Sequence, residues 1–361
     1  MDLTEVPAQR LLRQVSAALG GSSALGDASS ARSAGEAEDA ARAAFWLLQA
    51  EMLGLRGFGI DMLLRDLERL RAQPRSATAG SPASSAVPSA ASTAALTSPL
   101  TSASTPGAVL SIDASGLPGP LALAGAVRRA AEAADEHGVG LLGVRGTGAL
   151  GVLGLAARSL ALDGLVAVVA AQAPAMVAPW DGRAPAIGTN PLAFSAPRAG
   201  RSPLVADFAT SRITMAELRE RRGSGERLPE GAALDAAGEP TDDPANAAAL
   251  LPAGRLGSLV GLFVEVLAGA ATGGRVSEGG PSDGRGALVI AIDPERSGAG
   301  AGGGSVAESC ARIADDWVEA GGHLPGRFDR LPAAADLLPE TIAVPARSYE
   351  ALLRLDLGGA A

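Results

Sequence analysis

The spacing of apolar residues predicts that the N-terminal region is helical. Three segments have helix-like periodicity: residues 4–20, 36–53 and 60–70. In the second segment Phe45, Leu48 and Met52 recur every three or four residues, which places them on one helix face. We expect this stripe to be buried, and it is suited to bury apolar surface between two copies of the chain.

Downstream of residue 107, short apolar runs alternate with helix-like segments. The runs predict strands at residues 110–114, 139–144, 165–171, 190–197, 204–208 and 287–292. The helix-like segments include residues 121–137, 256–270, 305–320 and 348–355. A polar, arginine-rich connection is expected up to about Arg227. Strands interleaved with helices indicate an α/β architecture.

Residues 73–107, QPRSATAGSPASSAVPSAASTAALTSPLTSASTPG, interrupt this pattern. The segment is rich in Ser, Ala, Thr and Pro and almost free of charge. It has too little apolar bulk to offset the entropy lost on ordering. We therefore expect a flexible insertion or linker, with a mobile lid as the less favoured alternative.

Composition narrows the classes of function. Aromatic residues make up only 3% of a chain that is 47% apolar, so the core is expected to consist of Ala, Val and Leu. The net charge of −9 argues against a nucleic-acid partner, because phosphate binding needs a basic surface. All 30 basic residues are arginine, so no lysine can form a Schiff base or carry a proton.

The sequence offers little support for a disulfide, a metal site, a signal peptide or a membrane span. Cys310 is the single cysteine and His137 and His323 are the two histidines, so neither a disulfide nor a metal site is expected. The N-terminus has early acidic residues and no long apolar core, unlike a signal peptide. The most apolar helical segment, residues 258–272, is short and contains Glu265, so no membrane span is expected. These features predict a cytoplasmic protein.

The stretch from Gly146 to Gly151, GTGALG, fits the dinucleotide fingerprint G-x-G-x-x-G. That fingerprint also needs an acidic residue at the end of the second strand, to hold the ribose hydroxyls. The second apolar run ends at Gln172 without a carboxylate, and a chance match is common in a chain with 47 glycines. We therefore interpret this stretch as a different kind of loop.

Several motifs in order resemble the malate/L-lactate dehydrogenase family of type 2, which includes enzymes acting on sulfolactate, ureidoglycolate and cyclic imines. IGTNPLAFSAPR contains the family's cofactor loop GTNP, and PLVADFATS its D-x-A-T-S. GEPTDDP, LVGLFVEVLAGAATGG, ALVIAIDPE and LPG match later motifs. The resemblance covers nearly the whole chain outside residues 73–107. It implies an α/β fold with the family's non-Rossmann NAD(P)-binding architecture and an N-terminal helical region.

The resemblance also explains the glycine-rich loop. The family has a cofactor-contacting S-x-H-F-G at this place, so Ala149 occupies the position of its histidine. Cofactor contacts are thereby implied for Thr147, Gly148, Ala149, Leu150, Gly188, Thr189, Asn190, Pro191 and Arg255.

At three further positions this chain lacks the functional residue that the family has there. The family's S-H-G-x-x-R supplies a histidine acid/base and a carboxylate-binding arginine, but here Phe58 and Met62 stand in those positions. The lysine of its G-x-K-G is replaced by Leu256. Asp207 remains, although its implied role is to orient the histidine that is missing. Reduction of a 2-oxo acid needs a proton donor and a cation for the carboxylate, and the usual supplier of each is absent.

Several residues are candidates to replace these groups. Arg56, Arg65 or Arg145 could hold a carboxylate, although a solvated surface charge is the favoured interpretation of each. Asp61 or Asp207 could move a proton. For Asp207, hydrogen bonding to backbone N–H groups at a turn is an equally good explanation.

The resemblance implies four segments. Residues 1–72 form a helical region that packs with the C-terminal part, and residues 73–107 form the insertion. Residues 108–285 form an α/β domain of the cofactor-binding type. Residues 286–361 supply a strand and helices that complete the first domain.

The expected function is that of an NAD(P)-dependent oxidoreductase with a rebuilt substrate site, acting on an unusual, biosynthetic small molecule. Ordinary malate or lactate dehydrogenase activity is not expected. The alternative is a non-redox descendant, a cyclase, an isomerase or a non-catalytic partner, in which the NAD or NADP cofactor has been lost. Because family members form homodimers, the resemblance implies a homodimer.

Overall fold

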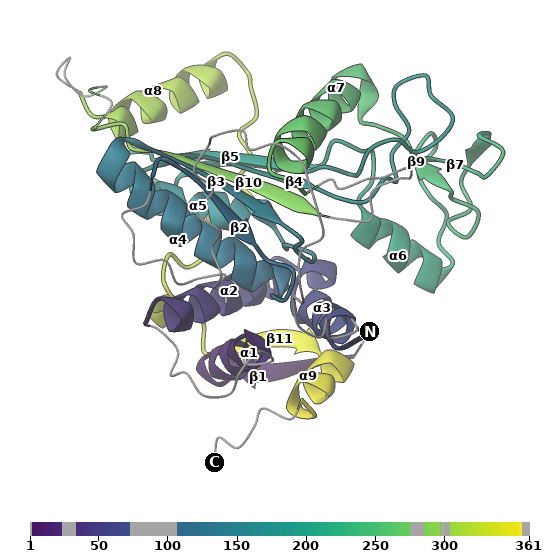
Figure 1. Ribbon diagram of the computed structural model, residues 1–361, viewed down its shortest axis with the longest axis horizontal. Helices are drawn as coiled ribbons and strands as arrows, with labels where there is room; N and C mark the ends of the chain where they lie inside the picture. Colours follow the sequence, from purple (N-terminus) through teal and green to yellow (C-terminus); the bar gives the residue numbers. More distant parts are fainter. Residues whose placement is uncertain are drawn as a thin grey trace, which may run out of the picture.

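The computed structural model describes residues 2–23, 34–72, 107–274, 285–296, 298 and 304–355 (Figure 1). The low-complexity segment predicted to be flexible lies outside the described residues, apart from Gly107. Within the described part of the chain, no helix is long and apolar enough to cross a membrane.

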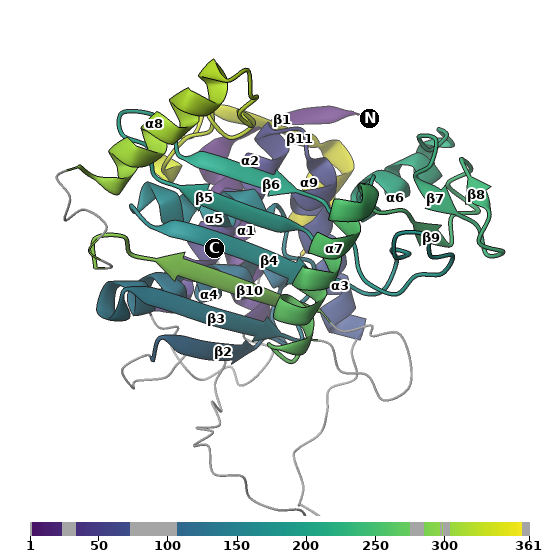
Figure 2. The same ribbon diagram turned by 90° about the horizontal axis from the view of Figure 1, so that it is seen from above.

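A six-stranded mixed sheet forms the centre of the molecule. Its strands lie in the order β2 (Val109–Asp113), β3 (Val139–Arg145), β10 (Gly286–Ile292), β4 (Val166–Gln172), β5 (Leu192–Ala196) and β6 (Leu204–Phe208). β2 is parallel to β3, and every other neighbouring pair is antiparallel. Figure 2 shows β10 running against the strands on both sides of it. The end of β3, the end of β4 and the start of β10 therefore meet at one edge of the sheet.

β10 directly follows the expected division of the chain at residue 285, and it pairs along its whole length with β3 and β4. Its continuous apolar sequence, GALVIAI, is typical of a strand buried at the centre of a sheet. The division into domains stays a prediction.

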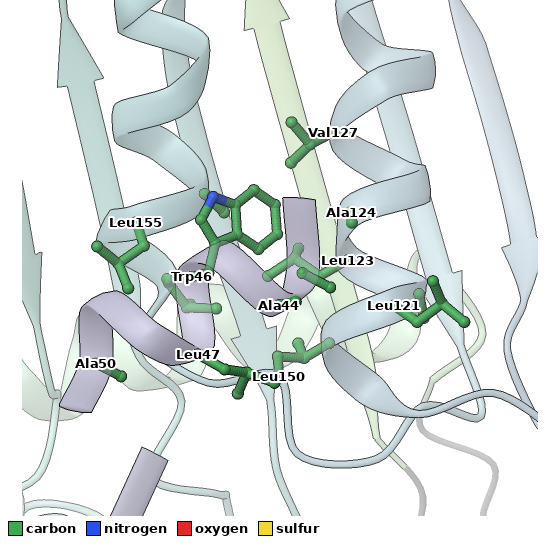
Figure 3. Close-up of a cluster of buried hydrophobic side chains, with 14 of the residues drawn as sticks. Ala44, Trp46, Leu47, Ala50, Leu121, Leu123, Ala124, Val127, Leu150 and Leu155 are labelled. Carbon is green, nitrogen blue, oxygen red and sulfur yellow. The ribbon is translucent and has the colours of Figure 1, made fainter. Parts of the chain in front are cut away.

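Three helices cover one face of the sheet. α4 (Gly119–His137) and α5 (Leu153–Leu162) lie directly on it, and α2 (Ala34–Met52) packs beneath them (Figure 1). Trp46 of α2 lies between Leu155 of α5 and Leu123 of α4 (Figure 3). Full burial of a large apolar side chain contributes about 1.5–3 kcal/mol, so this layer is a main source of stability.

The stripe predicted to lie between two copies of the chain packs in part against the core of one copy, and Phe45 and Met52 are half-buried. Leu48 has 0% of its surface exposed, and Phe45 and Met52 pack against the same core. α2 thus has neighbours from its own chain on this face. That the stripe also contributes to an interface between two copies stays a prediction.

The two ends of the described chain form a second, smaller layer. β1 (Leu3–Pro7) pairs antiparallel with β11 (Thr341–Pro345), beside α1 (Ala8–Ser23), α3 (Ile60–Ala72) and α9 (Ala346–Leu353) (Figure 1). The sequence analysis predicted helix from residue 4 and missed both strands. Only Val6 of β1 is buried, so the strand has no apolar alternation to reveal it.

The remaining elements are η1 (Arg56–Phe58), α6 (Met215–Ser224), β7 (Ala233–Leu234), β8 (Pro240–Thr241), β9 (Ala249–Leu250), α7 (Gly254–Val264), the π-helix η2 (Glu265–Ala270), α8 (Val306–Glu319) and η3 (Ala335–Leu337). Of these, η1 connects α2 to α3 and η3 lies beside α1, while the others lie on the other face of the sheet or beyond its edges (Figures 1 and 2). The arginine-rich stretch expected to be a connection contains α6. Only Leu218 of this helix is buried, so its apolar periodicity is weak, but the Thr214 side chain caps its first turn.

Candidate functional site

The site is built around the short turn η1 and the first turn of α3. Glu51, at the end of α2, accepts a hydrogen bond from the Ile60 backbone N–H at 2.8 Å and so satisfies a free donor at the start of α3. A Cβ on Gly59 would lie 2.1 Å from Glu51 Oε1, so this position requires glycine. Burial raises the pKa of Glu51 to about 7. Phe58 and Met62 are held on either side of this fixed turn.

The glycine-rich loop lies against Phe58 and Met62. Its glycines at 146 and 151 have φ angles of +68° and +91°, which other residues rarely adopt. A Cβ on Gly151 would lie 3.4 Å from Met62 Cε and 3.8 Å from the Phe58 carbonyl oxygen. Phe58 and Met62 are therefore neighbours of Gly151, although these residues are far apart in sequence and only the order of the motifs had related them.

Asp207, in β6, contacts the start of the helix that follows the glycine-rich loop. Its Oδ2 accepts a hydrogen bond from the Gly154 N–H at 3.0 Å, in the first turn of α5. Burial raises the pKa of the Asp207 carboxyl, while the Gly154 N–H and the charge of Arg327 oppose the shift. The observed bond is the backbone contact at a turn that the sequence allowed, and a role in proton transfer stays a prediction.

Hydrogen bonds of the Asn190 side chain fix the GTNP motif in the protein interior. Asn190 is fully buried: its Oδ1 accepts from the Ala173 N–H at 3.0 Å, and its Nδ2 donates to the Gly261 carbonyl at 2.9 Å and to Glu265 Oε2 at 2.7 Å. The Gly188 N–H also donates to Glu265 Oε2, at 3.3 Å. Because the Asn190 side chain is used internally, Thr189 and Pro191, both half-buried, are left as the more accessible residues of the motif.

Leu256 and Arg255 lie apart from this group, on the outer side of α7. Leu256 is 73% exposed, and Arg255 is also exposed. In the described chain Leu256 therefore faces solvent and does not pack against Phe58 or Met62.

The other candidate side chains from the sequence divide into two groups. Arg145 forms an exposed ion pair with Asp113 at 3.2 Å, and Asp61 bonds to Ser348 and Arg347 of α9, so both have structural partners. Arg56 Nε is buried with no hydrogen-bond partner. Arg65 Nη2 donates to the Gly57 carbonyl at 3.0 Å, directly over η1.

Sequence analysis missed two arginines that the fold brings to this place. The Arg285 carbonyl accepts a hydrogen bond from the Gly146 N–H at 3.0 Å, so Arg285 adjoins the start of the glycine-rich loop. Burial lowers the pKa of the Arg285 guanidinium, and the like charges of Arg219 and Arg69 lower it further, against the opposing effect of Asp66. No local pattern marks Arg219 or Arg285, since only the pairing of β10 and the docking of α6 bring them close.

Two buried polar atoms at the same edge of the sheet have no hydrogen-bond partner. They are Thr147 Oγ1, in the loop, and Gln172 Oε1, at the end of β4. Gln172 pairs with Gly286, next to Arg285. Buried polar atoms normally have a partner, so this edge has unused hydrogen-bonding capacity that a ligand or water can fill.

Two other kinds of site were sought in the described residues. An open pocket of about 470 Å³ lies beside β7 and β8. Its lining includes Trp180, Arg183, Arg212 and Pro252, and it shares no residue with the site above. Within the described ranges, no group of three His, Cys, Asp or Glu side chains could hold a metal ion.

Comparison with known proteins gives consistent results. A model of the malate/L-lactate dehydrogenase family matches residues 31–323. The (2R)-3-sulfolactate dehydrogenase (NADP(+)) of Chromohalobacter salexigens is 35% identical over 271 residues, which are 72% of this chain and 74% of that protein. The Delta(1)-pyrroline-2-carboxylate reductase of Ancylobacter novellus is 35% identical over 260 residues, 69% of this chain and 76% of that protein. The crystal structure of delta1-piperideine-2-carboxylate reductase from Pseudomonas syringae has a TM-score of 0.72 and 27% identity, covering 98% of this chain and 100% of that one.

Proposed function

Because the chain belongs to the malate/L-lactate dehydrogenase family, we propose that it is an NAD(P)-dependent oxidoreductase with a rebuilt substrate site. Its relatives are dehydrogenases and reductases, and oxidoreductase chemistry is the common property. The rebuilt site is supported by one observation: Phe58, Met62 and the loop carrying Ala149 lie together and offer neither a proton donor nor a cation.

The residues at the edge of the sheet fit a nicotinamide dinucleotide. Such a cofactor carries hydroxyl, amide and phosphate groups, which suit the unpartnered Thr147 Oγ1 and Gln172 Oε1 and the nearby arginines. The loop backbone at 148–150, Thr189 and Pro191 would complete the binding residues. When bound, the nicotinamide supplies or accepts a hydride.

The loss of proton donors favours a carbon–nitrogen double bond as the reducible group. Hydride addition to a carbonyl carbon leaves an alkoxide that needs a proton, whereas addition to a protonated imine gives the neutral amine directly. An imine takes its proton from solvent before the hydride arrives, so an apolar surface at Phe58 and Ala149 is tolerated. Two of the similar proteins reduce cyclic imines of this kind by name. We propose that a cyclic imine is the substrate class.

The test is oxidation of NADH or NADPH with two classes of acceptor. Delta(1)-pyrroline-2-carboxylate should be reduced, while pyruvate and oxaloacetate should give only the background rate. In the reverse direction malate and lactate should also give background. Fast turnover of any of these four acids would contradict the rebuilt site.

We further propose a homodimer formed through α7. Leu256, Leu259 and Phe263 of α7 and Val266 of η2 are all more than half exposed and recur at helical spacing, so they form one apolar stripe. A soluble chain rarely leaves so continuous an apolar surface uncovered, and a second copy can cover it symmetrically.

A further inference from the structure

Four arginines from three separate elements converge beside the glycine-rich loop. Arg65 and Arg69 come from α3, Arg219 from α6, and Arg285 immediately precedes β10. Arg285 is half-buried, and Arg65 and Arg219 are exposed at the rim. The like charges of Arg219 and Arg69 act on Arg285, so these residues form a cationic cluster.

Backbone contacts fix these elements relative to one another. The Gly146 N–H donates to the Arg285 carbonyl at 3.0 Å, which ties Arg285 to the loop. Arg65 Nη2 donates to the Gly57 carbonyl at 3.0 Å, which places it over η1. A Cβ on Gly57 would lie 3.1 Å from Ala216 Cβ, so the first turn of α6, one turn before Arg219, packs on the same element.

The cationic cluster has little negative charge beside it. Asp66 is the carboxylate beside Arg285, but its Oδ1 accepts from Arg69 Nε and its Oδ2 from the Gly119 N–H, each at 2.7 Å. Arg65, Arg219 and Arg285 form no ion pair with any residue that the structure describes. Arg69 Nη2 is buried without a hydrogen-bond partner. Like charges held together in this way disfavour the empty state and favour one with a bound anion.

We propose that Arg285, Arg219 and Arg65 bind an oxyanion of the ligand, in place of the cation that is missing at Met62. The oxyanion is the carboxylate or sulfonate of the substrate, or a phosphate of the cofactor. Guanidinium groups suit all of these because their parallel N–H donors match the spacing of two oxygens. The assignment rests on the proposed function, since it places the ligand of that reaction at this cationic cluster.

The test measures binding of inorganic pyrophosphate, NADH and NADPH by calorimetry, and the KM of Delta(1)-pyrroline-2-carboxylate. The variants are Arg285→Gln and Arg219→Gln, with Arg10→Gln, an exposed arginine on α1, as the matched control. Loss of one charged hydrogen-bond partner should weaken binding of the relevant ligand about ten- to a hundredfold. Arg219 is exposed, so its variant remains informative if Arg285→Gln fails to fold.

The pattern of losses identifies the source of the oxyanion. Weaker binding of NADPH alone indicates its extra phosphate, and weaker binding of both cofactors indicates their shared diphosphate. An increased KM for the imino acid with unchanged cofactor binding indicates the substrate carboxylate. Each result supports the proposal.

The proposal is overturned if both variants stay within twofold of the Arg10→Gln control for all four ligands, or if the wild type binds no anion. Binding of pyrophosphate without binding of either cofactor has a different meaning. In that case the cationic cluster is retained as an anion site and the proposed oxidoreductase function fails.

Discussion

Asn190 Nδ2 donates a hydrogen bond to Glu265 Oε2 at 2.7 Å, and this bond joins the GTNP loop to η2 in the interior of the protein. Two of the family's motifs, GTNP and LVGLFVEVLAGAATGG, are thus joined in a single buried network. Replacing Asn190 with Ala leaves the Ala173 N–H without this partner and removes one of the hydrogen bonds to Glu265. An unpaired buried group costs about 1–3 kcal/mol and a hydrogen bond to a charged group contributes about 1.5–3 kcal/mol, so the variant should lose about 3–5 kcal/mol of unfolding free energy.

Urea denaturation checks this value. Asn246→Ala is the matched control, because Asn246 is exposed and its amide bonds only to the surface residue Asp243. The control should stay within about 0.5 kcal/mol of the wild type. Equal losses in the two variants would show that the buried network adds no stability.

Glu51 should make stability depend on pH. Its pKa is raised from 4.5 to about 7, so the folded state holds more protons than the unfolded state between these values. Stability is therefore highest below about pH 4.5 and falls by about 3 kcal/mol as pH rises through 7, at 1.36 kcal/mol per pKa unit. Glu51→Gln can still accept the Ile60 hydrogen bond and should lack this decline.

The measurement is the free energy of unfolding of wild type and Glu51→Gln from pH 4.5 to 8. Glu350→Gln, which alters an exposed ion pair with Arg354, should leave the wild-type curve unchanged in shape. Parallel curves for wild type and Glu51→Gln would contradict the raised pKa.

Restoring the family's polar groups should restore activity toward 2-oxo acids. The triple variant Phe58→His, Met62→Arg, Ala149→His supplies a proton donor and a cation where the structure brings these positions together. General acid catalysis contributes about a hundred- to ten-thousandfold, so kcat/KM for oxaloacetate should rise well above the wild-type background. Phe58→Leu, Met62→Leu, Ala149→Val is the apolar control. A folded, cofactor-binding triple variant with no gain would show that these positions do not adjoin the reacting atoms.

The α7 stripe should control assembly. Phe263→Asp places a charge at the centre of the proposed interface and should convert a dimer to a monomer in light scattering at micromolar protein. Leu337→Asp changes an equally exposed leucine in η3 and should leave the mass unchanged. A dimeric Phe263→Asp, or a monomeric wild type, would exclude this interface.

Local sequence patterns predicted those helices and strands that are marked by their own residues. The helix expected at 121–137 is α4, which ends at His137 because Gly138 adopts a φ of +82° that closes the helix. The strand expected at 204–208 is β6 without change. In contrast, β1 pairs with β11 from the opposite end of the chain, and it buries only Val6, so it has no apolar alternation by which to be found alone.

The site likewise contains residues that the sequence could relate and residues that only the fold brings together. Motif order was sufficient to relate Phe58, Met62 and the glycine-rich loop, and the fold places them in contact. Arg285 and Arg219 have no motif, and they join the site only because β10 inserts beside β3 and α6 docks on η1. Their like charges lie close together through tertiary structure alone, which a single sequence does not report.

The central claim is that the chain works with a nicotinamide cofactor. Its most direct test is calorimetric titration of the wild-type protein with NADPH and with NADH, at a protein concentration of tens of micromolar. We predict saturable binding of at least one of them, weakened by Arg285→Gln or by a change at Thr147. Binding of neither would contradict the account and favour a non-redox descendant that has kept the family's fold.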